Sequence, residues 1–431
     1  MTNRQPARPG RRVLRNAGAL TGSNLWRIGV SFGLQLLVAR WLGTVALGQY
    51  TVALAWLNVA QVVSELGLQG LLVRDLAQTP HLRKGYFRLA LTVQLGAAVL
   101  ICLCLLGLGW LLPVSSTLRL SLGLAGLTLP AYAITSVCQT FFQAGERMEL
   151  VMVIEVIINT LIVGLSVLAI GLGGAVPALM GVMVITQIVS ALLCLFWLQR
   201  SGLLAAPQDA PAQSALAPAP HFTMAPTIVW RQVAPFYGQA LADVLLQRVD
   251  ILLLSMMGNP TITGIYSAAY SVVRVLWKVI QSYWRAFYPT LSRLALTQNA
   301  RFRQLCRNGL QYGLVLVLLG VAASLLLADW LLPLILGAEG AASVPAFDAL
   351  IWSSPFFFIE MYAVIVLMVD HRPRLSLLLT TVHLAAVIVL LPLLATYFGA
   401  LGAAWAATAA SLLGALVSVG LIWRRNLPVL R

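Results

Sequence analysis

The sequence predicts an all-α polytopic membrane protein with about twelve transmembrane helices in two six-helix lobes. Of its 431 residues, 60% are hydrophobic and only 10% are charged, whereas a soluble domain has about 25% charged residues. Apolar runs of about 20 residues, long enough to cross a bilayer as a helix, recur along nearly the whole chain. The basic residues gather between those runs and at both chain ends, which is typical of cytoplasmic segments.

The expected spans follow from these apolar runs. They lie at 18–40, 46–70, 88–112, 119–143, 150–171, 175–198, 233–257, 264–288, 309–332, 347–369, 375–397 and 400–423. With twelve spans, nearly all Lys and Arg residues between them fall on one side of the membrane. Only Arg40 and Arg119 fall on the other side, together with Asp329, Glu339 and Asp348. The positive-inside rule therefore predicts that both termini are cytoplasmic.

A Pro/Ala-rich run at residues 200–228 separates the sixth and seventh spans and is expected to be a flexible cytoplasmic linker. The expected organisation is a basic cytoplasmic N-terminus (1–17), an N-lobe (18–199), the linker (200–230), a C-lobe (231–423) and a basic cytoplasmic C-terminus (424–431). The segment Leu42–Tyr50 is similar to Met257–Tyr266, at an offset of 215 to 216 residues. Since each segment joins the first two spans of its half, the similarity indicates an internal repeat, a common plan among transporters.

Composition and motifs exclude several classes of protein. The net charge of +15 does not indicate nucleic-acid binding, because the arginines cluster next to the apolar runs. This placement favours contact with anionic lipid headgroups. The five cysteines include no CxxC pair and the four histidines are scattered, so neither a metal site nor a cofactor is expected. The sequence has no Walker loop, GxSxG or HExxH motif, so we expect a protein that is not an enzyme.

The expected spans at 233–257 and 264–288 contain ionisable residues, which are rare inside a membrane. The first contains Asp243, Arg248 and Asp250, and the second contains Arg274, Lys278 and Arg285. A charge at the bilayer centre costs about 2.5–3.5 kcal/mol on insertion scales, so such residues usually face a polar path. At about 100° per residue, Ser267, Ser271, Arg274, Lys278, Gln281 and Arg285 share one helical face. The alternative is that acids and bases only join the two helices, but the three bases on one face leave a surplus of positive charge.

Depth within this hairpin predicts two ion pairs. Counted from the turn at Gly258–Gly264, Asp243 and Lys278 lie at similar depths, and so do Asp250 and Arg274. Arg248 lies on a different side of its helix from the two acids, and the sequence does not place it. Further polar residues within the expected spans are Arg27, Gln35, Gln61, Glu65, Glu155 and Glu360. His383 also lies inside a span, where a packed histidine and a proton relay are both compatible with the pattern.

Several stretches resemble the polysaccharide-exporting flippases of the multidrug/oligosaccharidyl-lipid/polysaccharide exporter superfamily. They are Leu37-Val38-Ala39-Arg40-Trp41-Leu42-Gly43, Glu65-Leu66-Gly67-Leu68, Phe142-Gln143-Ala144-Gly145-Glu146-Arg147 and Arg248-Val249-Asp250-Ile251 with Gly264-Ile265-Tyr266-Ser267. The resemblance is strong in spans one, two, four, seven and eight and vague in the last four. It implies a bacterial inner-membrane protein in which two six-helix lobes form a cavity that opens alternately to each side. The implied substrate is a polyprenyl-pyrophosphate-linked oligosaccharide.

For a substrate of this kind, the depth and charge of the polar residues indicate their roles. The residues expected to bind pyrophosphate or sugar are Arg27, Arg248, Arg274, Lys278, Arg285, Gln35, Gln61 and Gln281, with Arg27 as the main candidate for the pyrophosphate. Those expected to pair charges or couple transport to an ion are Asp243, Asp250, Glu360, Glu65 and Glu155, with Glu360 as the main candidate for coupling. Polysaccharide polymerase or export machinery is an expected partner.

Three alternatives stay open. A cation-coupled multidrug/toxin antiporter of the same superfamily would favour an acidic cavity, which the surplus of bases argues against. A lipid II flippase is a second alternative, but the chains of that group have two additional spans, and the sequence shows no such spans. A non-transporting scaffold of a polysaccharide assembly complex would have no need of deep charges on several helices.

Overall fold

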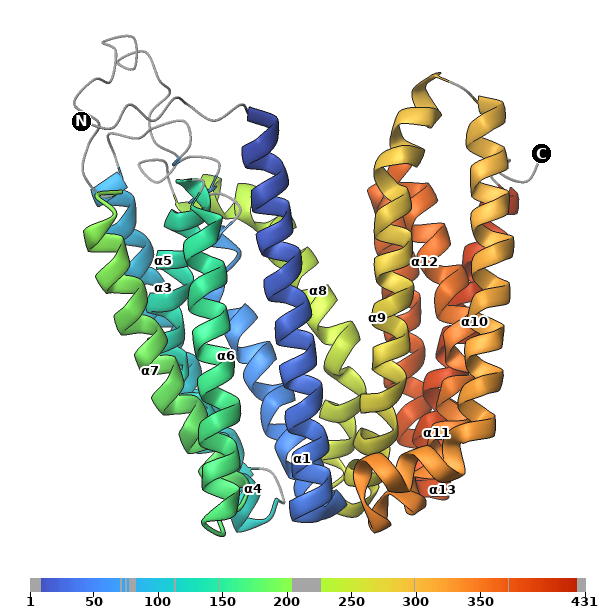
Figure 1. Cartoon of the computed structure of the whole chain (residues 1–431), viewed down its shortest axis with the longest axis horizontal. Helices are drawn as coiled ribbons and strands as arrows, with labels where there is room; N and C mark the ends of the chain where they lie inside the picture. Colours follow the sequence, from blue (N-terminus) through green and yellow to red (C-terminus); the bar gives the residue numbers. More distant parts are fainter. Residues whose placement is uncertain are drawn as a thin grey trace. The chain divides into compact units, whose positions relative to one another are not determined.

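A computed structural model describes residues 9–69, 72–73, 76, 83–111, 114–145, 147–203, 226–297, 299–370 and 372–424. Most of the expected linker, the first eight residues and the last seven lie outside these ranges. All regular structure within them is helical (Figure 1). The elements are α1 (Pro9–Glu65), α3 (Arg83–Leu111), α4 (Ser116–Leu127), α5 (Leu129–Ala144), α6 (Met148–Gly171), α7 (Val176–Arg200), α8 (Pro226–Met256), α9 (Pro260–Thr297), α10 (Asn299–Leu336), the 3₁₀ helix η4 (Ala338–Ser343), α11 (Val344–Ile351), α12 (Ser353–Val369) and α13 (Pro373–Arg424).

Two of these helices are much longer than one membrane crossing requires. α1 has 57 residues and α13 has 52, against about 20 for a single crossing. Each is broken at a glycine in the left-handed region, Gly43 (φ 87°) in α1 and Gly399 (φ 60°) in α13. A glycine tolerates this conformation because it has no Cβ. The breaks coincide with the expected gaps between spans at 40–46 and 397–400.

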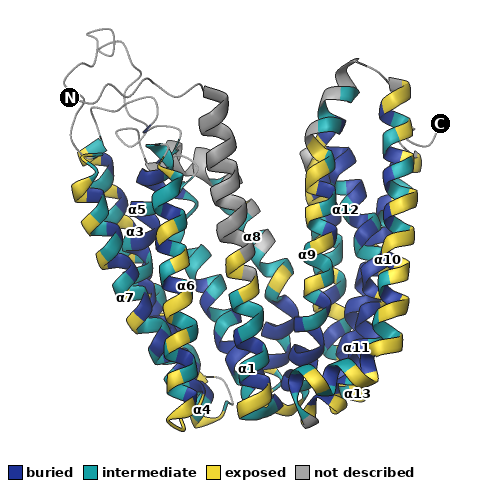
Figure 2. Ribbon diagram, in the orientation of Figure 1, coloured by how far each residue is buried: buried dark blue, intermediate teal, exposed yellow. Residues whose placement is uncertain are grey.

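Among the described residues, eight helical stretches are long and apolar enough to cross a membrane. They include the part of α1 from Gly29, α4 with α5, and η4 with α11 and α12. α8 and α9 have 31 and 38 residues and are not among the eight, because the polar and charged residues of the hairpin lower their hydropathy. Figure 2 shows exposed residues along α10 and buried residues along α12. Between its polar ends, α10 exposes large apolar side chains, among them Tyr312, Leu319, Leu326 and Trp330, as expected of a surface that faces lipid.

The chain divides into two compact units. The first comprises the described parts of Met1–Leu34 and Ala53–Val244, and the second comprises Gln35–Val52 and Leu245–Arg431. Two segments therefore belong to a different unit from the lobe in which the sequence places them. Residues 35–52 of α1, here named the α1 tip, pack with the second unit, and the first part of α8 packs with the first unit. The contacts of the α1 tip described below give the physical reason.

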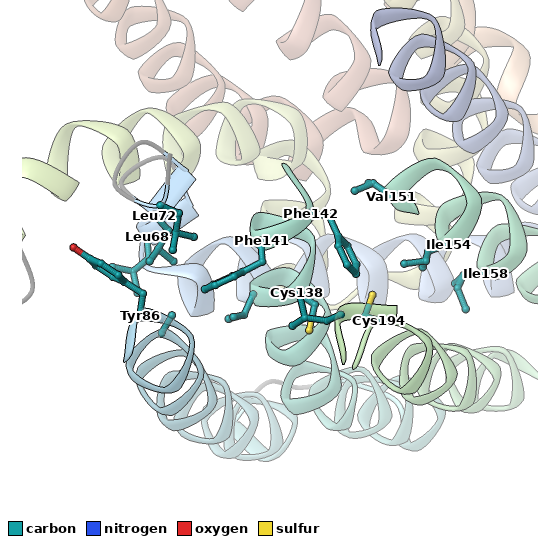
Figure 3. Packing of buried hydrophobic residues seen from close by; sticks show 14 residues of the cluster. Leu68, Leu72, Tyr86, Cys138, Phe141, Phe142, Val151, Ile154, Ile158 and Cys194 are labelled. Carbon is teal, nitrogen blue, oxygen red and sulfur yellow. The ribbon is translucent and has the colours of Figure 1, made fainter. Parts of the chain in front are cut away.

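The first unit is built from α3 to α7, and α7 packs on α4, α5 and α6. Its core contains Phe141, Phe142 and Cys138 from α5. Figure 3 shows side chains of this helix lying against Ile154 of α6 and Cys194 of α7. All five cysteines are free thiols, and four of them are buried, where they pack as small apolar side chains.

The second unit packs α9 against α10, α11, α12 and α13, and α12 against α13 (Figure 1). Aromatic rings join α9 to α12. Trp284 is fully buried, lies 5.0 Å from the ring of Phe358 and 5.2 Å from that of Tyr362, and donates its indole N–H to the Phe358 carbonyl at 3.2 Å. Large rings that bury both an apolar face and a satisfied N–H make a rigid seam. This seam fixes α9, which carries the three bases Arg274, Lys278 and Arg285.

The α1 tip is bound at both of its sides within the second unit. Glu339 of η4 accepts hydrogen bonds from the Thr44 amide N–H at 2.8 Å and from the Thr44 hydroxyl at 3.0 Å. On the other side, the backbones of Gly48 and Gly264 approach so closely that a Cβ on Gly48 would lie 2.7 Å from the Gly264 nitrogen. Thr51 donates to Ser267 at 2.8 Å. Gly48 and Gly264 are 216 positions apart, and so are Thr51 and Ser267. This separation equals the offset between the two similar segments of the sequence.

Candidate functional site

A cluster of charged and phenolic side chains lies in the second unit, here named the Asp250 cluster. It is defined by its five residues Tyr50, Arg248, Asp250, Tyr266 and Arg274, and Tyr270 lies beside them. Asp250 of α8 is 6% exposed and Tyr266 of α9 is fully buried. The Tyr266 hydroxyl donates to Asp250 Oδ2 at 2.8 Å, and the Ile251 backbone N–H donates to Asp250 Oδ1 at 2.8 Å. Both oxygens of this carboxylate therefore have a neutral donor.

Two guanidiniums lie close enough to act electrostatically on that carboxylate and on each other. They belong to Arg248 and Arg274, both partly buried. Within the described residues, neither has a hydrogen bond or an ion pair, so the expected pair between Asp250 and Arg274 is not formed. Arg248, which the sequence left unplaced, belongs to the same cluster. A guanidinium whose N–H groups are not used within the protein can bind the oxygens of a phosphate or carboxylate in a bidentate manner.

The polar face of α9 becomes more exposed along its length. Ser267 and Ser271 are buried, Arg274, Lys278 and Gln281 are partly buried, and Arg285 is exposed. Lys278 donates to the Gln281 side chain at 3.2 Å. The side chain of Asp243 lies outside the described residues, so its pairing with Lys278 stays a prediction.

A second acidic site in this unit joins α12 to α13. Glu360 is 7% exposed, and its Oε2 lies 2.8 Å from Nδ1 of His383. The second half of α13 reaches the same carboxylate through Gly414, where a Cβ would lie 3.0 Å from Glu360 Oε2. Asp250 acts electrostatically on His383, so this pair lies near the Asp250 cluster. The sequence indicated Glu360 as a candidate and gave His383 no definite role.

The first unit has a polar site of its own, around Glu65 at the end of α1. The Glu65 carboxylate accepts hydrogen bonds from Tyr132 and Ser136 of α5. Its backbone carbonyl accepts one from Gln94 of α3 at 3.3 Å. The charge of Arg27, an exposed side chain, acts on Tyr132. This cluster contains the expected residues Arg27 and Glu65 and two partners, Tyr132 and Ser136, that were not expected.

The remaining expected residues lie apart from these clusters. Gln35 is buried, whereas Gln61 and Glu155 are partly buried. Within the described part of the chain, no hydrogen bond links any of the three to the clusters. The same part of the chain contains no group of three or more His, Cys, Asp and Glu residues that could hold a metal ion.

Solved structures of other proteins share this fold. The lipid II flippase MurJ in an inward closed conformation superposes with a TM-score of 0.67 at 13% identity, over 95% of this chain and 87% of that one. An inward-facing multidrug resistance MATE family transporter of the MOP superfamily superposes with a TM-score of 0.68 at 13% identity, over 93% and 94%. The MATE multidrug transporter DinF-BH gives a TM-score of 0.63 at 16% identity, over the full length of both chains. The fold is therefore that of the MOP superfamily transporters.

The sequence identifies the family within that class. Residues 13–295 match the family described as polysaccharide biosynthesis protein, and the chain belongs to this family. No curated protein matches the sequence. The expected resemblance to the superfamily of polysaccharide exporters is confirmed, and the chain is a multi-pass membrane protein.

Proposed function

We propose that the protein is a flippase that moves a polyprenyl-pyrophosphate-linked oligosaccharide across the bacterial inner membrane by alternating access. Membership of the polysaccharide biosynthesis family and the transporter fold support this proposal. In the proposed topology, the helices cross the membrane twelve times and both termini are cytoplasmic. α1 and α13 each cross twice, with the glycine breaks at Gly43 and Gly399 between the crossings.

The observation that carries the choice of substrate is the pair of guanidiniums in the Asp250 cluster. The charge of Arg274 acts on Arg248, and within the described residues no hydrogen bond or ion pair occupies either of them. Like charges repel, and a partly buried pair is costly unless an anion binds it. A pyrophosphate that links a lipid to a sugar carries one negative charge on each phosphate, and its oxygens match the geometry of a guanidinium. A cationic drug, the substrate expected of an antiporter, would be repelled by this pair.

The coupling site that we propose is the Glu360–His383 pair. A buried carboxylate in contact with an imidazole forms a unit whose charge changes when it gains or loses one proton. Because Asp250 acts electrostatically on His383, a change of charge at this pair would be felt at the Asp250 cluster. Arg27 in the first unit is proposed as a further residue that binds pyrophosphate during transport, and its charge acts on Tyr132.

The substrate proposal is tested in proteoliposomes with a fluorescent polyprenyl-pyrophosphate-linked oligosaccharide, by measuring how fast it crosses the bilayer. Arg248→Ala and Arg274→Ala each remove a charged hydrogen-bond donor, worth about 1.5–3 kcal/mol, so transport should fall about 10-fold or more. Arg248→Lys and Arg274→Lys should recover part of the rate, because an ammonium keeps the charge but loses the bidentate fork. Arg27→Ala, tested alongside, should express normally and lose transport.

The matched control is Arg301→Ala, which removes an exposed arginine at the start of α10 and should transport normally. Unchanged transport by well-folded Arg248→Ala and Arg274→Ala would contradict the assignment of the guanidinium pair to the pyrophosphate. Efflux of a cationic dye by the parent protein, without movement of the lipid-linked sugar, would instead favour an antiporter.

A further inference from the structure

We propose that Tyr266 is a positioning residue for the anion site: it holds the Asp250 carboxylate away from Arg248 and Arg274, so that these guanidiniums stay available to the phosphate groups of the substrate. This inference rests on the proposed function, because it assumes that the guanidinium pair binds an anion. It assigns a role to a side chain that does not itself touch the substrate.

The hydrogen bonds of Asp250 carry the first step. An aspartate near two arginines ordinarily pairs with one of them, since charge-assisted hydrogen bonds are stronger than neutral ones. Here Oδ2 accepts from the Tyr266 hydroxyl at 2.8 Å and Oδ1 accepts from the Ile251 N–H at 2.8 Å. Both distances are those of well-formed hydrogen bonds. The carboxylate thus lowers the electrostatic cost of the two nearby positive charges without forming a contact ion pair.

The second step is the rigidity of Tyr266. Its ring is fully buried and is stacked on that of Tyr270, with centroids 5.8 Å apart and planes at 19°. It lies on α9 just after Gly264, where the backbone is packed tightly against the α1 tip. A phenol held in this way keeps its hydroxyl in one place and loses little entropy when it binds the carboxylate.

Removal of the hydroxyl should therefore change the partner of Asp250. In Tyr266→Phe the buried Oδ2 loses its donor, and a buried acceptor without a donor is unfavourable. The cationic groups that act on this carboxylate, and that would be attracted to the freed oxygen, are the guanidiniums of Arg248 and Arg274. An ion pair formed there would compete directly with an anionic ligand, so the anion site would weaken although both arginines are intact.

The test uses the full-length protein in lipid nanodiscs and inorganic pyrophosphate as the probe, with binding measured by calorimetry. Tyr266→Phe should weaken binding about 10-fold, as expected if a protein carboxylate takes up one charged contact. The double variant Tyr266→Phe/Asp250→Asn should restore binding to nearly that of the parent, because an amide does not form an ion pair. Asp250→Asn alone should bind pyrophosphate at least as tightly as the parent.

Tyr270→Phe is the matched control, since it removes the same group from the neighbouring ring, whose hydroxyl donates to the Gln247 carbonyl at 3.1 Å. It should bind pyrophosphate as the parent does. Three results would overturn the inference: parent-like binding by Tyr266→Phe, no rescue by the added Asp250→Asn, or weaker binding by Asp250→Asn alone. If Tyr266→Phe does not fold, the binding of pyrophosphate by Asp250→Asn alone tests the inference, and weaker binding than that of the parent overturns it. A parent protein that binds pyrophosphate no better than Arg248→Ala would instead contradict the proposed function.

Discussion

At the scale of single residues, a buried carboxylate has a definite chemical role only when its partner is known. Glu360 contacts His383 at 2.8 Å, and Gly414 allows α13 to pack directly on the carboxylate. Little water reaches a pair enclosed in this way, so a proton or cation bound there changes the local charge strongly. These features fit a site at which transport is linked to an ion gradient.

Glu360→Gln tests this role because it keeps the shape of the side chain and an acceptor for His383 but cannot ionise. Transport of the lipid-linked sugar should lose its dependence on an applied proton or sodium gradient. The measurement is the transport rate in proteoliposomes with and without each gradient. Asp370→Asn is the control, since Asp370 follows the same helix and pairs with Arg372 at 2.7 Å. If Glu360→Gln keeps the parent's gradient dependence, the coupling assignment is wrong.

The charged members of these sites could be predicted from the sequence, because an ionisable residue in an apolar run is conspicuous. Arg248, Asp250, Arg274 and Glu360 all stand out in this way. Their neutral partners could not be predicted in the same way. Tyr266 lies in an apolar helix where tyrosine is ordinary, and its contact with Asp250 depends on how α8 and α9 pack.

At the scale of elements, the α1 tip is held by a helix cap supplied from a distant segment. The break at Gly43 exposes the N–H groups of the following helical turn, and Glu339 accepts from the Thr44 N–H at 2.8 Å. A carboxylate at a helix N-terminus also interacts favourably with the helix dipole. A Cβ on Gly43 would lie 2.9 Å from Glu339 Oε2, so glycine is required there for both conformation and space.

Gly264→Ala tests how tightly the tip is packed. The added Cβ would lie 2.2 Å from the Thr44 carbonyl oxygen, so the backbone must move, at a cost of about 1–3 kcal/mol. Thermal unfolding in detergent should therefore begin at a lower temperature. Gly181→Ala in α7 is the control, because nothing lies within 4 Å of its added Cβ. Equal melting of the two variants would show that the tip is not tightly held.

Helix positions could be predicted from hydropathy. The similarity of Leu42–Tyr50 to Met257–Tyr266, at an offset of 215 to 216 residues, also indicated which connections between helices correspond in the two halves. The assignment of the α1 tip to the second unit was not predictable. It depends on contacts between residues about 216 to 295 positions apart, such as Thr51 with Ser267 and Thr44 with Glu339, which leave no periodic signal within either segment.

At the scale of the whole molecule, the distribution of charge sets the orientation in the membrane. α10 shows this within one helix. Its first turns carry Arg301, Arg303 and Arg307, and Glu339 follows just beyond its other end. At about 1.5 Å per residue, the 38 residues of α10 separate these ends by about 57 Å, more than the thickness of a bilayer. The basic end is therefore expected to be cytoplasmic and the acidic end to lie outside.

Cysteine labelling tests this orientation and the twelve-crossing topology together. In a background without the native cysteines, Ala341→Cys lies in η4, where Ala341 is exposed, and should react with a membrane-impermeant thiol reagent added to intact cells. Ser214→Cys, in the linker outside the described residues, should react only after the cells are permeabilised, because that linker is expected in the cytoplasm. The permeabilised sample is also the control that the Ser214 site can react at all. Labelling of Ser214→Cys in intact cells would place an odd number of crossings before the linker, and the orientation of every later helix would then be reversed.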